Sequence, residues 1–473
     1  GAQHRQLRRL QARGQSSLGP ASAGGRSQSR GAVYSGSGAP GYRLNATPMV
    51  ARPSDLPGAP LRVLFVNDTA RNGGPGRALY SILKFVDRQA IRRTLMLPRP
   101  GVISEMFDAA GLVDEIVFEP NLIENAFEPW DRAVSREDLE APRWLKGIRL
   151  AGNIGRATYG FGKLVKYIRQ SRFDLIYCNG TNACFAGAAL AKASGVPALW
   201  HVHYTSVPKA VELLHDRLAA LPAVGGIVCV SKPAAALFPQ LSAKTEVIHN
   251  LLDTDEYARH AVKPVLRDEL GLGSDVVIFG SHGRVLPRKG YVEFIHGAER
   301  ALAELTEDER EKVRFVVVGD TPEDLRPDHL AECRTLVAAR GLGKHVHFLG
   351  FRADVRPYLA DFDVTVVPSV YPDPLPLSVI EGMAMATPVI AFDVGGVAEM
   401  LADGETGVLV PGTPPDVPAL AREMVRYLRD PSLRQKQGVR ARARILERFG
   451  PQQAKAFEAA MFRAANKPFP REV

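Results

Sequence analysis

The feature that most constrains the fold is an alternation of short apolar runs with helical segments, which starts at residue 61 and continues almost to the end of the chain. The first run, Leu61–Val66, precedes the glycine-rich turn Gly73–Gly76 and a helical pattern from Arg77 to Val86. Apolar, β-branched runs of this length are typical of strands buried on both faces. Because strands that alternate with helices form parallel sheets, the sequence predicts a doubly wound α/β fold.

The apolar runs fall into two series, which predict two domains. The first series has seven expected strands: Leu61–Val66, Thr94–Leu97, Glu115–Phe118, Asp174–Cys178, Ala198–Val202, Gly226–Val230 and Glu246–His249. The second series has six: Val276–Gly280, Val313–Val318, His345–Leu349, Asp363–Val367, Pro388–Ala391 and Gly407–Val410. We expect the seam within Asp253–Leu270, an N-terminal domain over 61–262, a C-terminal domain over 263–440 and a C-terminal helical segment over 441–473.

The positive charge of the chain is concentrated before the first domain. The net charge is +9, and residues 1–60 contain eight arginines but one acid, Asp55. These residues are rich in Gly, Ser and Arg and poor in large apolar side chains, so we expect a disordered tail, either a transit-peptide-like segment or a plain extension. The rest of the chain is nearly neutral, so we expect no specific nucleic-acid partner.

Two further observations concern the compartment. No apolar run approaches the ~18 residues that a membrane-spanning helix needs. The four cysteines, Cys178, Cys184, Cys229 and Cys333, form no CxxC pair, which argues against a disulfide framework or a zinc site. The sequence therefore predicts a cytoplasmic protein without a structural metal.

Cations and carboxylates cluster after strands of the second series. Arg284 and Lys289 lie in the loop after Val276–Gly280, where parallel sheets bind ligands, and their charges suit a diphosphate. Asp373 lies in a proline-rich loop after Asp363–Val367, and Glu381 lies about one turn into a helix that we expect to begin near Leu377. A carboxylate at that place can accept hydrogen bonds from the vicinal hydroxyls of a ribose. The alternatives are a solvated basic loop and an acid favoured by the helix dipole.

The first series offers two weaker candidates. Gly73 and Gly74 precede a helix whose N-terminus can face an anion, although a tight turn without a ligand explains them equally well. Their spacing is not GxGxxG, which disfavours a nicotinamide dinucleotide site. His201 and His203 alternate on one face at the end of a strand. Hydrogen bonding to a polar substrate is the favoured interpretation, ahead of a metal site, because no further ligands stand at a useful spacing.

A basic segment from Arg143 to Arg172 contains eight cations and no acid, with apolar residues at helical spacing between them. Basic and apolar residues in this pattern are typical of a helix that lies on an anionic membrane surface. The solvated face of an ordinary helix is an equally good interpretation, so both remain open.

Taken together, these motifs resemble the family 4 retaining nucleotide-sugar glycosyltransferases. The resemblance covers most of residues 61–462, and its ordered set of motifs is specific although each motif alone is weak. The motifs are the Gly73–Gly76 loop, Trp200–Tyr204, Val228–Ser231, Val247–Tyr257, Gly283–Gly290 and Pro372–Leu401. The sequence departs from the family at Asp373, where glutamate is usual, and at Leu375-Pro376, where Phe-Gly is usual.

The resemblance implies a GT-B fold, with two Rossmann-like domains facing a central cleft and the segment 441–473 crossing back to the N-terminal domain. It implies that Arg284 and Lys289 bind the donor diphosphate, that Asp373 and His203 face the transferred sugar, and that Glu381 binds the nucleotide ribose. It also implies substrate contacts from the following residues: Gly73, Gly74, His201, Leu375, Leu377, Gly395 and Gly396.

The function that the resemblance implies is retaining transfer of a sugar from a nucleotide diphosphate sugar to an acceptor hydroxyl, without a metal or another cofactor. The acceptor is expected to be a glycan or a lipid-linked molecule of polysaccharide, lipopolysaccharide or glycolipid synthesis. This acceptor fits a peripheral position on the inner face of the plasma membrane. The alternatives are a sugar-nucleotide 2-epimerase of the same fold, a catalytically inactive scaffold and, third, a Rossmann oxidoreductase.

Overall fold

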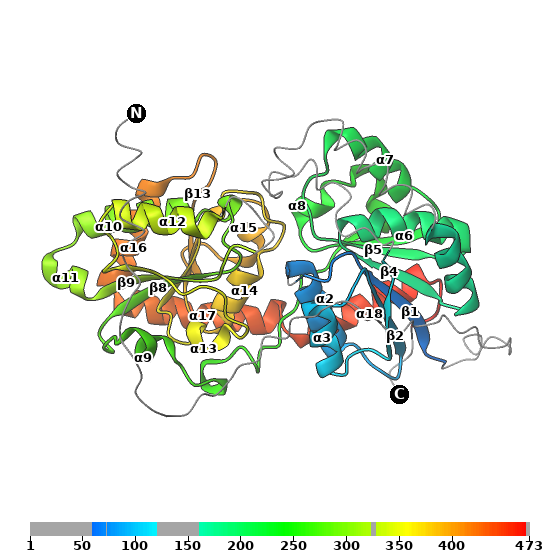
Figure 1. Cartoon of the computed structure of the whole chain (residues 1–473), viewed down its shortest axis with the longest axis horizontal. Coiled ribbons are helices and arrows are strands. Elements are labelled where there is room, and N and C mark those ends of the chain that lie inside the picture. Colours follow the sequence, from blue (N-terminus) through cyan, green and yellow to red (C-terminus); the bar gives the residue numbers. More distant parts are fainter. Residues whose placement is uncertain (1–58, 72, 121–159, 323–327, 470–473) are drawn as a thin grey trace, which may run out of the picture. The chain divides into compact units, whose positions relative to one another are not determined.

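The computed structural model describes residues 59–71, 73–120, 160–322 and 328–469, and almost all of the expected tail lies outside these ranges. The described residues form two β-sheets flanked by helices (Figure 1). The strand order is β3-β2-β1-β4-β5-β6-β7 in the first sheet and β10-β9-β8-β11-β12-β13 in the second. All neighbouring strands are parallel, which confirms the two doubly wound α/β halves predicted from the sequence.

The elements of the first half follow the alternation of the sequence. Its strands are β1 (Leu61–Asn67), β2 (Ile91–Leu97), β3 (Glu115–Phe118), β4 (Leu175–Asn179), β5 (Ala198–Val202), β6 (Val224–Cys229) and β7 (Thr245–Val247). Its helices are α2 (Gly74–Phe85), α3 (Val102–Ala109), a helix described over 160–170, α6 (Thr181–Ser194), α7 (Lys209–Ala219) and α8 (Lys232–Ala235).

The second half has six strands: β8 (Val277–His282), β9 (Val313–Val318), β10 (Val346–Phe348), β11 (Val364–Val367), β12 (Val389–Asp393) and β13 (Gly407–Pro411). The helices up to β11 are α9 (Leu266–Leu270), α10 (Tyr291–Glu304), α11 (Glu307–Glu311), α12 (His329–Ala339) and α13 (Arg356–Leu359). The helices after β11 are α14 (Leu377–Ala384), α15 (Val397–Met400), α16 (Val417–Arg429), α17 (Pro431–Arg448) and α18 (Ala454–Ala464).

Helices cover both faces of each sheet, and successive strand residues point to opposite faces, so both sets of side chains are buried. In β1, Val63 and Phe65 pack with α2 and α3, whereas Leu64 and Val66 pack with α6. In the second sheet, Phe279 packs with α10, α12 and α16, and its neighbour Ile278 packs with α9 and α13 on the other side. The continuous apolar runs of the sequence are therefore explained by two-sided burial.

Each sheet has one point where the strand order reverses. In the first sheet this point lies between β1 and β4, and in the second it lies between β8 and β11. Ligands of open parallel sheets bind outside the carboxyl ends of the strands at such points. Asn67 and Asn179 end the strands at the first point, and His282 and Val367 end them at the second.

Several element boundaries differ by one to three residues from those predicted from the sequence, and two of these differences lie near the sites. The helix expected from Arg77 begins at Gly74. Pro75 fits the first turn of this helix, because N–H groups there have no partner within the helix and proline has no N–H. The strand expected to end at Gly280 continues to His282, because Ser281 and His282 still pair with β9. This extension places His282 directly at the reversal point of the second sheet.

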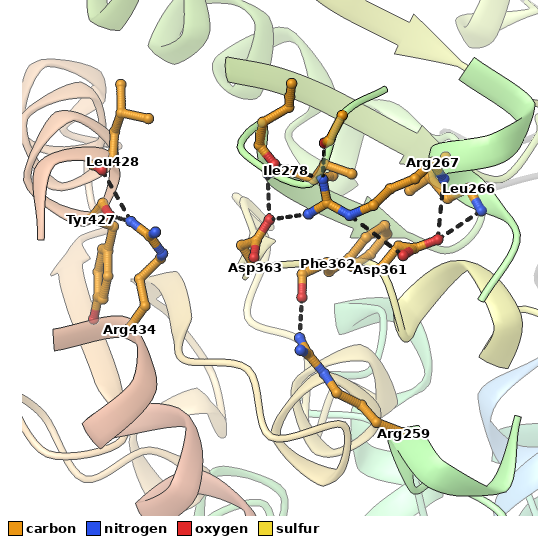
Figure 2. A network of polar contacts seen from close by, with 12 residues as sticks. Arg259, Leu266, Arg267, Ile278, Asp361, Phe362, Asp363, Tyr427, Leu428 and Arg434 are labelled. Carbon is orange, nitrogen blue, oxygen red and sulfur yellow. Dashed lines mark hydrogen bonds and ion pairs between the residues drawn. The ribbon is translucent and has the colours of Figure 1, made fainter. Parts of the chain in front are cut away.

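At the amino-terminal ends of β8 and β11 in the second sheet, ion pairs and hydrogen bonds connect the segment before β8 with the segment before β11 (Figure 2). The guanidinium of Arg267 donates a hydrogen bond to Asp363 Oδ2 over 2.8 Å, and the same oxygen accepts the backbone N–H of Ile278 over 2.8 Å. The carboxylate of Asp361 accepts the N–H of Leu266 over 2.8 Å at the start of α9. These contacts anchor the segment that enters the second half.

The C-terminal helix α18 belongs to the core of the first sheet, although it ends the chain. Phe457 and Met461 are fully buried and pack with Leu79 and Ile82 of α2, and Figure 1 shows α18 beside α2 and β1. The preceding helix α17 packs against α14 of the second half. The chain therefore returns to the first sheet between α17 and α18.

Candidate functional site

The loop after β8 carries the two cations that the sequence analysis assigns to the diphosphate. Arg284 is exposed, and Lys289 is half-buried just before α10. Gly290 has a φ of +72°, and a Cβ at this position would lie 1.7 Å from the carbonyl oxygen of Pro368. Only glycine fits such a backbone contact. The loop is therefore held against the segment that follows β11.

The structure brings Lys289 and Asp373 together in one ion pair, although 84 residues separate them in the chain. The Nζ atom of Lys289 donates to Oδ2 of Asp373, and the two side chains are 22% and 19% exposed. Charges partly shielded from water interact more strongly than charges on an open surface. The ammonium group is thus oriented toward the loop that carries the predicted sugar-facing acid.

Gly395 and Gly396 lie against the backbone of the loop that carries Asp373. The N–H of Gly396 donates to the carbonyl oxygen of Asp373 over 2.9 Å, and a Cβ on Gly396 would lie 1.9 Å from the carbonyl oxygen of Pro374. These glycines therefore permit a close backbone contact within the protein. Their expected contact with substrate remains a prediction.

The two leucines of the motif have different surroundings. Leu375 is 4% exposed and packs in the core with Val379 and Ile380, so only its backbone is left to meet a ligand. Leu377 is half-buried at the first position of α14, directly after Pro376. The first N–H groups of a helix have no partner within that helix and can face an anion or hydroxyl oxygens.

Glu381 is buried in the second turn of α14 and is held by two donors. Its Oε2 atom lies 2.6 Å from His282 Nε2, and its Oε1 atom accepts the hydroxyl of Tyr257 over 3.2 Å. Burial alone would raise the pKa of this carboxyl, but the contacts with His282, the charge of Arg77 and the hydroxyl of Tyr257 outweigh burial and lower the pKa below its usual range. Glu381 is therefore an ionised acceptor at neutral pH.

The end of the first sheet carries a second polar cluster. His203 Nε2 lies 2.9 Å from Asn179 Oδ1 and 3.2 Å from His201 Nδ1, and His201 Nδ1 lies 2.8 Å from the hydroxyl of Tyr177. The amide of Asn179 also donates to Asn67 Oδ1 over 2.6 Å. The two predicted histidines are thus in contact with each other. They lie at the end of β5, next to the reversal point between β1 and β4.

Both histidines are neutral at physiological pH. Burial lowers the pKa of His203 to about 3, and burial together with the neighbouring His203 lowers the pKa of His201 well below its usual range. Among the described residues, no group of three or more His, Cys, Asp or Glu side chains is arranged to hold a metal ion. This cluster is a set of neutral hydrogen-bonding groups.

Gly73 and Gly74 lie at the start of α2, a few residues after Asn67 of this cluster. Gly73 is the N-cap residue, and among the described residues no atom apart from the adjoining backbone lies within 4 Å of where a Cβ would stand on either glycine. The next residue, Pro75, accepts a hydrogen bond from the amide of Asn179 over 3.0 Å. The start of α2 and the histidine pair are therefore connected through one side chain.

Hydrogen bonds also join the two halves near the predicted sites. Thr205, just after β5, donates its hydroxyl to the carbonyl oxygen of Pro372, the neighbour of Asp373, over 2.8 Å. Glu399 of α15 accepts the backbone N–H of Lys232 over 2.7 Å and lies 3.0 Å from His249 Nε2. The segment that follows His203 thus reaches the loop that carries Asp373.

The basic segment from Arg143 to Arg172 is described only from residue 160 onward. In this part Lys163 and Lys166 are exposed, whereas Leu164 and Ile168 are buried in the core of the first half. Leu164 and Ile168 are therefore core residues and are not available to insert into a membrane. Among the described residues, no helix is long and apolar enough to cross a membrane.

Sequence analysis missed five residues of the two clusters: Asn67, Tyr177, Asn179, Tyr257 and His282. Asn179 follows an expected strand directly, and a polar residue at a strand end is the signal that could have identified it. His282 stands in the stretch Gly280–Gly283, which does not read as a strand, and the contact of Tyr257 with Glu381 spans 124 residues.

Two family models match the chain, and together they cover most of it. The model of group 1 glycosyl transferases matches residues 262–444, and the model of glycosyltransferase family 4 matches residues 128–256. The two matches meet between β7 and α9, where the first half gives way to the second. The chain therefore belongs to the family 4, or group 1, nucleotide-sugar glycosyltransferases of the GT-B fold.

The individual relatives have low sequence identity to this chain. An alpha-D-kanosaminyltransferase of Streptomyces kanamyceticus is 28% identical over 283 residues, which are 55% of this chain and 69% of that protein. A D-inositol 3-phosphate glycosyltransferase of Streptomyces avermitilis is 34% identical over 236 residues, which are 49% of each chain. The alignments thus span about half to two thirds of these relatives. The crystal structure of HepE of Anabaena in complex with UDP and glucose is 23% identical, with a TM-score of 0.66, and covers 84% of this chain and 98% of that chain.

Proposed function

We propose that this chain transfers a glycosyl group from a nucleotide diphosphate sugar to an acceptor hydroxyl and retains the anomeric configuration. The observation that carries this proposal is the pairing of Lys289 with Asp373 and of His282 with Glu381 at the reversal point of the second sheet. A cation for a diphosphate beside an ionised acid for ribose hydroxyls is the combination that a nucleotide sugar requires.

The difficult step is separation of the diphosphate from a sugar that becomes oxocarbenium-like. Lys289 and Arg284 stabilise the negative charge that develops on the leaving diphosphate. When Lys289 turns to the phosphate, the carboxylate of Asp373 is released from its ion pair and can accept hydrogen bonds from the sugar. Because the loop supplies its own positive charge, we expect transfer to proceed without a divalent metal and in the presence of EDTA.

The first half takes the acceptor in this proposal. Support comes from the neutral His203, which offers hydrogen bonding without charge, and from the contact of Thr205 with Pro372 beside Asp373. In this proposal His203 faces the transferred sugar. The carboxylate of Asp68, which directly follows β1, accepts the backbone N–H groups of Asn182 and Ala183, so attack on the same face as the leaving group is the route that we favour for retention.

A glycan or lipid-linked acceptor of polysaccharide, lipopolysaccharide or glycolipid synthesis is the second part of the proposal, with the chain peripheral on the cytoplasmic face of a membrane. The support is the exposed pair Lys163 and Lys166, each of which contributes about 1 kcal/mol near an anionic surface. In co-sedimentation with anionic vesicles, the Lys163→Glu/Lys166→Glu variant should bind less than a Lys312→Glu/Lys344→Glu control. Equal binding of both variants would remove this support.

Two experiments test the reaction itself. Thermal unfolding in the presence of UDP, GDP, ADP and dTDP should show one nucleotide that raises the melting temperature, because a ligand of the folded state stabilises it by mass action. The matching nucleotide sugar, incubated with candidate acceptors, should give a product whose anomeric proton coupling matches that of the donor. An altered sugar nucleotide formed without acceptor would indicate a 2-epimerase, and binding without turnover would indicate an inactive scaffold.

A further inference from the structure

The reversal point of the first sheet holds a chain of hydrogen bonds that begins and ends on the protein backbone. Asn67 Nδ2 donates to the carbonyl oxygen of Thr69 over 2.6 Å, and Asn67 Oδ1 accepts from Asn179 Nδ2 over 2.6 Å. Asn179 Nδ2 donates also to the carbonyl oxygen of Pro75 over 3.0 Å, and Asn179 Oδ1 lies 2.9 Å from His203 Nε2. Both hydrogens of the Asn179 amide are thus in use.

The direction of every bond in this chain is fixed by chemistry. A backbone carbonyl only accepts, so the amide nitrogens of Asn67 and Asn179 must face Thr69 and Pro75 respectively. The oxygen of the Asn179 amide then faces His203. An amide oxygen accepts and cannot donate, so His203 Nε2 must carry a proton.

The neighbours of His203 agree with a proton on Nε2. The titratable groups that face its ring are His201 of β5 and, through His201, Tyr177 of β4. His201 Nδ1 lies 3.2 Å from His203 Nε2 and 2.8 Å from the Tyr177 hydroxyl, and its single lone pair can accept from either donor. Because burial lowers the pKa of His203 to about 3, the ring carries a single proton at neutral pH, and Nδ1 is left with a lone pair.

We propose that Asn179 is a positioning residue that locks His203 in the tautomer protonated at Nε2 and so presents Nδ1 to the substrates as a hydrogen-bond acceptor. The same amide binds Pro75, so one side chain sets both the start of α2 and the histidine. His203 then accepts a hydrogen bond from a substrate hydroxyl and cannot donate one. Only this last step rests on the proposed glycosyl transfer, because the tautomer follows from the contacts alone.

The tautomer is measured without any assay of activity. Histidine labelled with ¹⁵N gives long-range ¹H–¹⁵N correlation patterns that distinguish the two neutral tautomers and the charged ring, and the signals of His203 are identified by their loss in His203→Gln. We expect a wild-type pattern with the proton on Nε2 that does not change between pH 6 and pH 9. A proton on Nδ1, or titration of His203 in this range, would overturn the proposal.

Variants of Asn179 test the lock itself. Asn179→Ala removes the acceptor, so a mixture of tautomers should replace the single pattern. Asn179→Asp places a carboxylate against Nε2 and raises the pKa of His203, so the charged ring should appear as the pH is lowered. The matched control is Asn466→Asp, which adds the same charge at an exposed position and should leave the His203 pattern unchanged. A wild-type pattern in both Asn179 variants would contradict the lock.

The pH profile connects the lock to catalysis. Since the neutral ring is the active form, kcat/KM of Asn179→Asp should fall as the pH is lowered, by about tenfold for each unit below the raised pKa of His203. The wild type and Asn466→Asp should show no such limb. A merely structural role of Asn179 would lower activity equally at every pH. If the tautomer is found but no nucleotide sugar reacts, the proposed function fails while the assignment of the proton stands.

Discussion

Glu381 remains ionised in an almost closed site because His282 and Tyr257 face its two oxygens. The side chains of His282 and Glu381 are 4% and 8% exposed. A buried carboxylate is costly unless donors compensate for lost water, so each donor fixes both the charge and the orientation of the acid. Any ligand that uses Glu381 therefore meets an acid whose position is set by His282.

The first prediction concerns this pair. His282→Ala removes a donor at 2.6 Å and should weaken binding of the cognate nucleoside diphosphate by about tenfold, the usual size of one lost charged hydrogen bond. Calorimetry measures the affinity, and His296→Ala, on the surface of α10, is the control. For the 2′,3′-dideoxy nucleotide the loss should disappear, because Glu381 has no hydroxyl left to bind. An equal loss for both nucleotides would show that His282 does not act through the ribose.

The second prediction follows from the lowered pKa of Glu381. A carboxyl whose pKa is lower in the folded than in the unfolded state contributes stability above its usual pKa of 4.5 and loses this contribution as the pH falls through the lowered value. The melting temperature of the wild type should therefore fall more steeply from about pH 5 to pH 3 than that of Glu381→Gln. Calorimetric scans check this, with exposed Glu405→Gln as the control. Parallel curves for wild type and Glu381→Gln would contradict it.

At the scale of elements, the site of Lys289 and Asp373 depends on three segments that pack backbone against backbone. The loop after β8 contacts Pro368 through Gly290, and the loop after β12 contacts Pro374 through Gly396. Two loops thus support the segment between β11 and α14, which carries Asp373. A small displacement of this support moves the acid away from Lys289.

The third prediction tests this support. Gly396→Ala places a Cβ 1.9 Å from the Pro374 carbonyl oxygen, which forces the Asp373 loop to shift. We expect kcat/KM to fall by about 100-fold, the size of effect that a misplacement of about 1 Å causes, while circular dichroism stays close to the wild-type spectrum. Gly343→Ala is the matched control, because in the described part of the chain no atom beyond its own neighbours lies within 4 Å of its Cβ position. Full activity of Gly396→Ala would show that this contact does not position the loop.

The sequence predicts elements better than it predicts pairs of side chains. Strands such as Leu61–Val66 are visible because burial on both faces leaves a local apolar signature. Lys289 and Asp373 stand in loops that the strand pattern located, but their ion pair depends on β8 and β11 being neighbours. The strand order is a property of the whole sheet. The place of His282 at the end of β8 could not be predicted for the same reason, because it depends on the pairing of His282 with Val318 of β9.

At the scale of the molecule, the last helix links the end of the chain to its beginning. Phe457 of α18 is fully buried with Leu79 and Ile82, and its ring centroid lies 5.3 Å from that of His201. The core beneath the histidine pair therefore includes a residue that follows the entire second half. Stability of the first half and the position of His201 both depend on this helix.

The fourth prediction follows from this packing. Phe457→Ala should lower the free energy of unfolding by about 3–5 kcal/mol, because it removes a large side chain and leaves a cavity. Urea denaturation followed by fluorescence measures the change. Phe351→Ala, whose ring is 58% exposed, should change stability by no more than about 0.5 kcal/mol. Equal effects of the two substitutions would show that α18 contributes little to the core.

The central claim is that the loop after β8 and the Asp373 loop form the diphosphate site of a nucleotide sugar. Its most direct test is calorimetric binding of the cognate nucleoside diphosphate to the wild type, to Lys289→Ala and to Lys344→Ala, which removes an exposed, ion-paired lysine far from this loop in the chain. We predict that Lys289→Ala loses about 2 kcal/mol of binding free energy, a factor of about 30 in affinity, and that Lys344→Ala binds as the wild type does. Wild-type affinity in Lys289→Ala would contradict the claim.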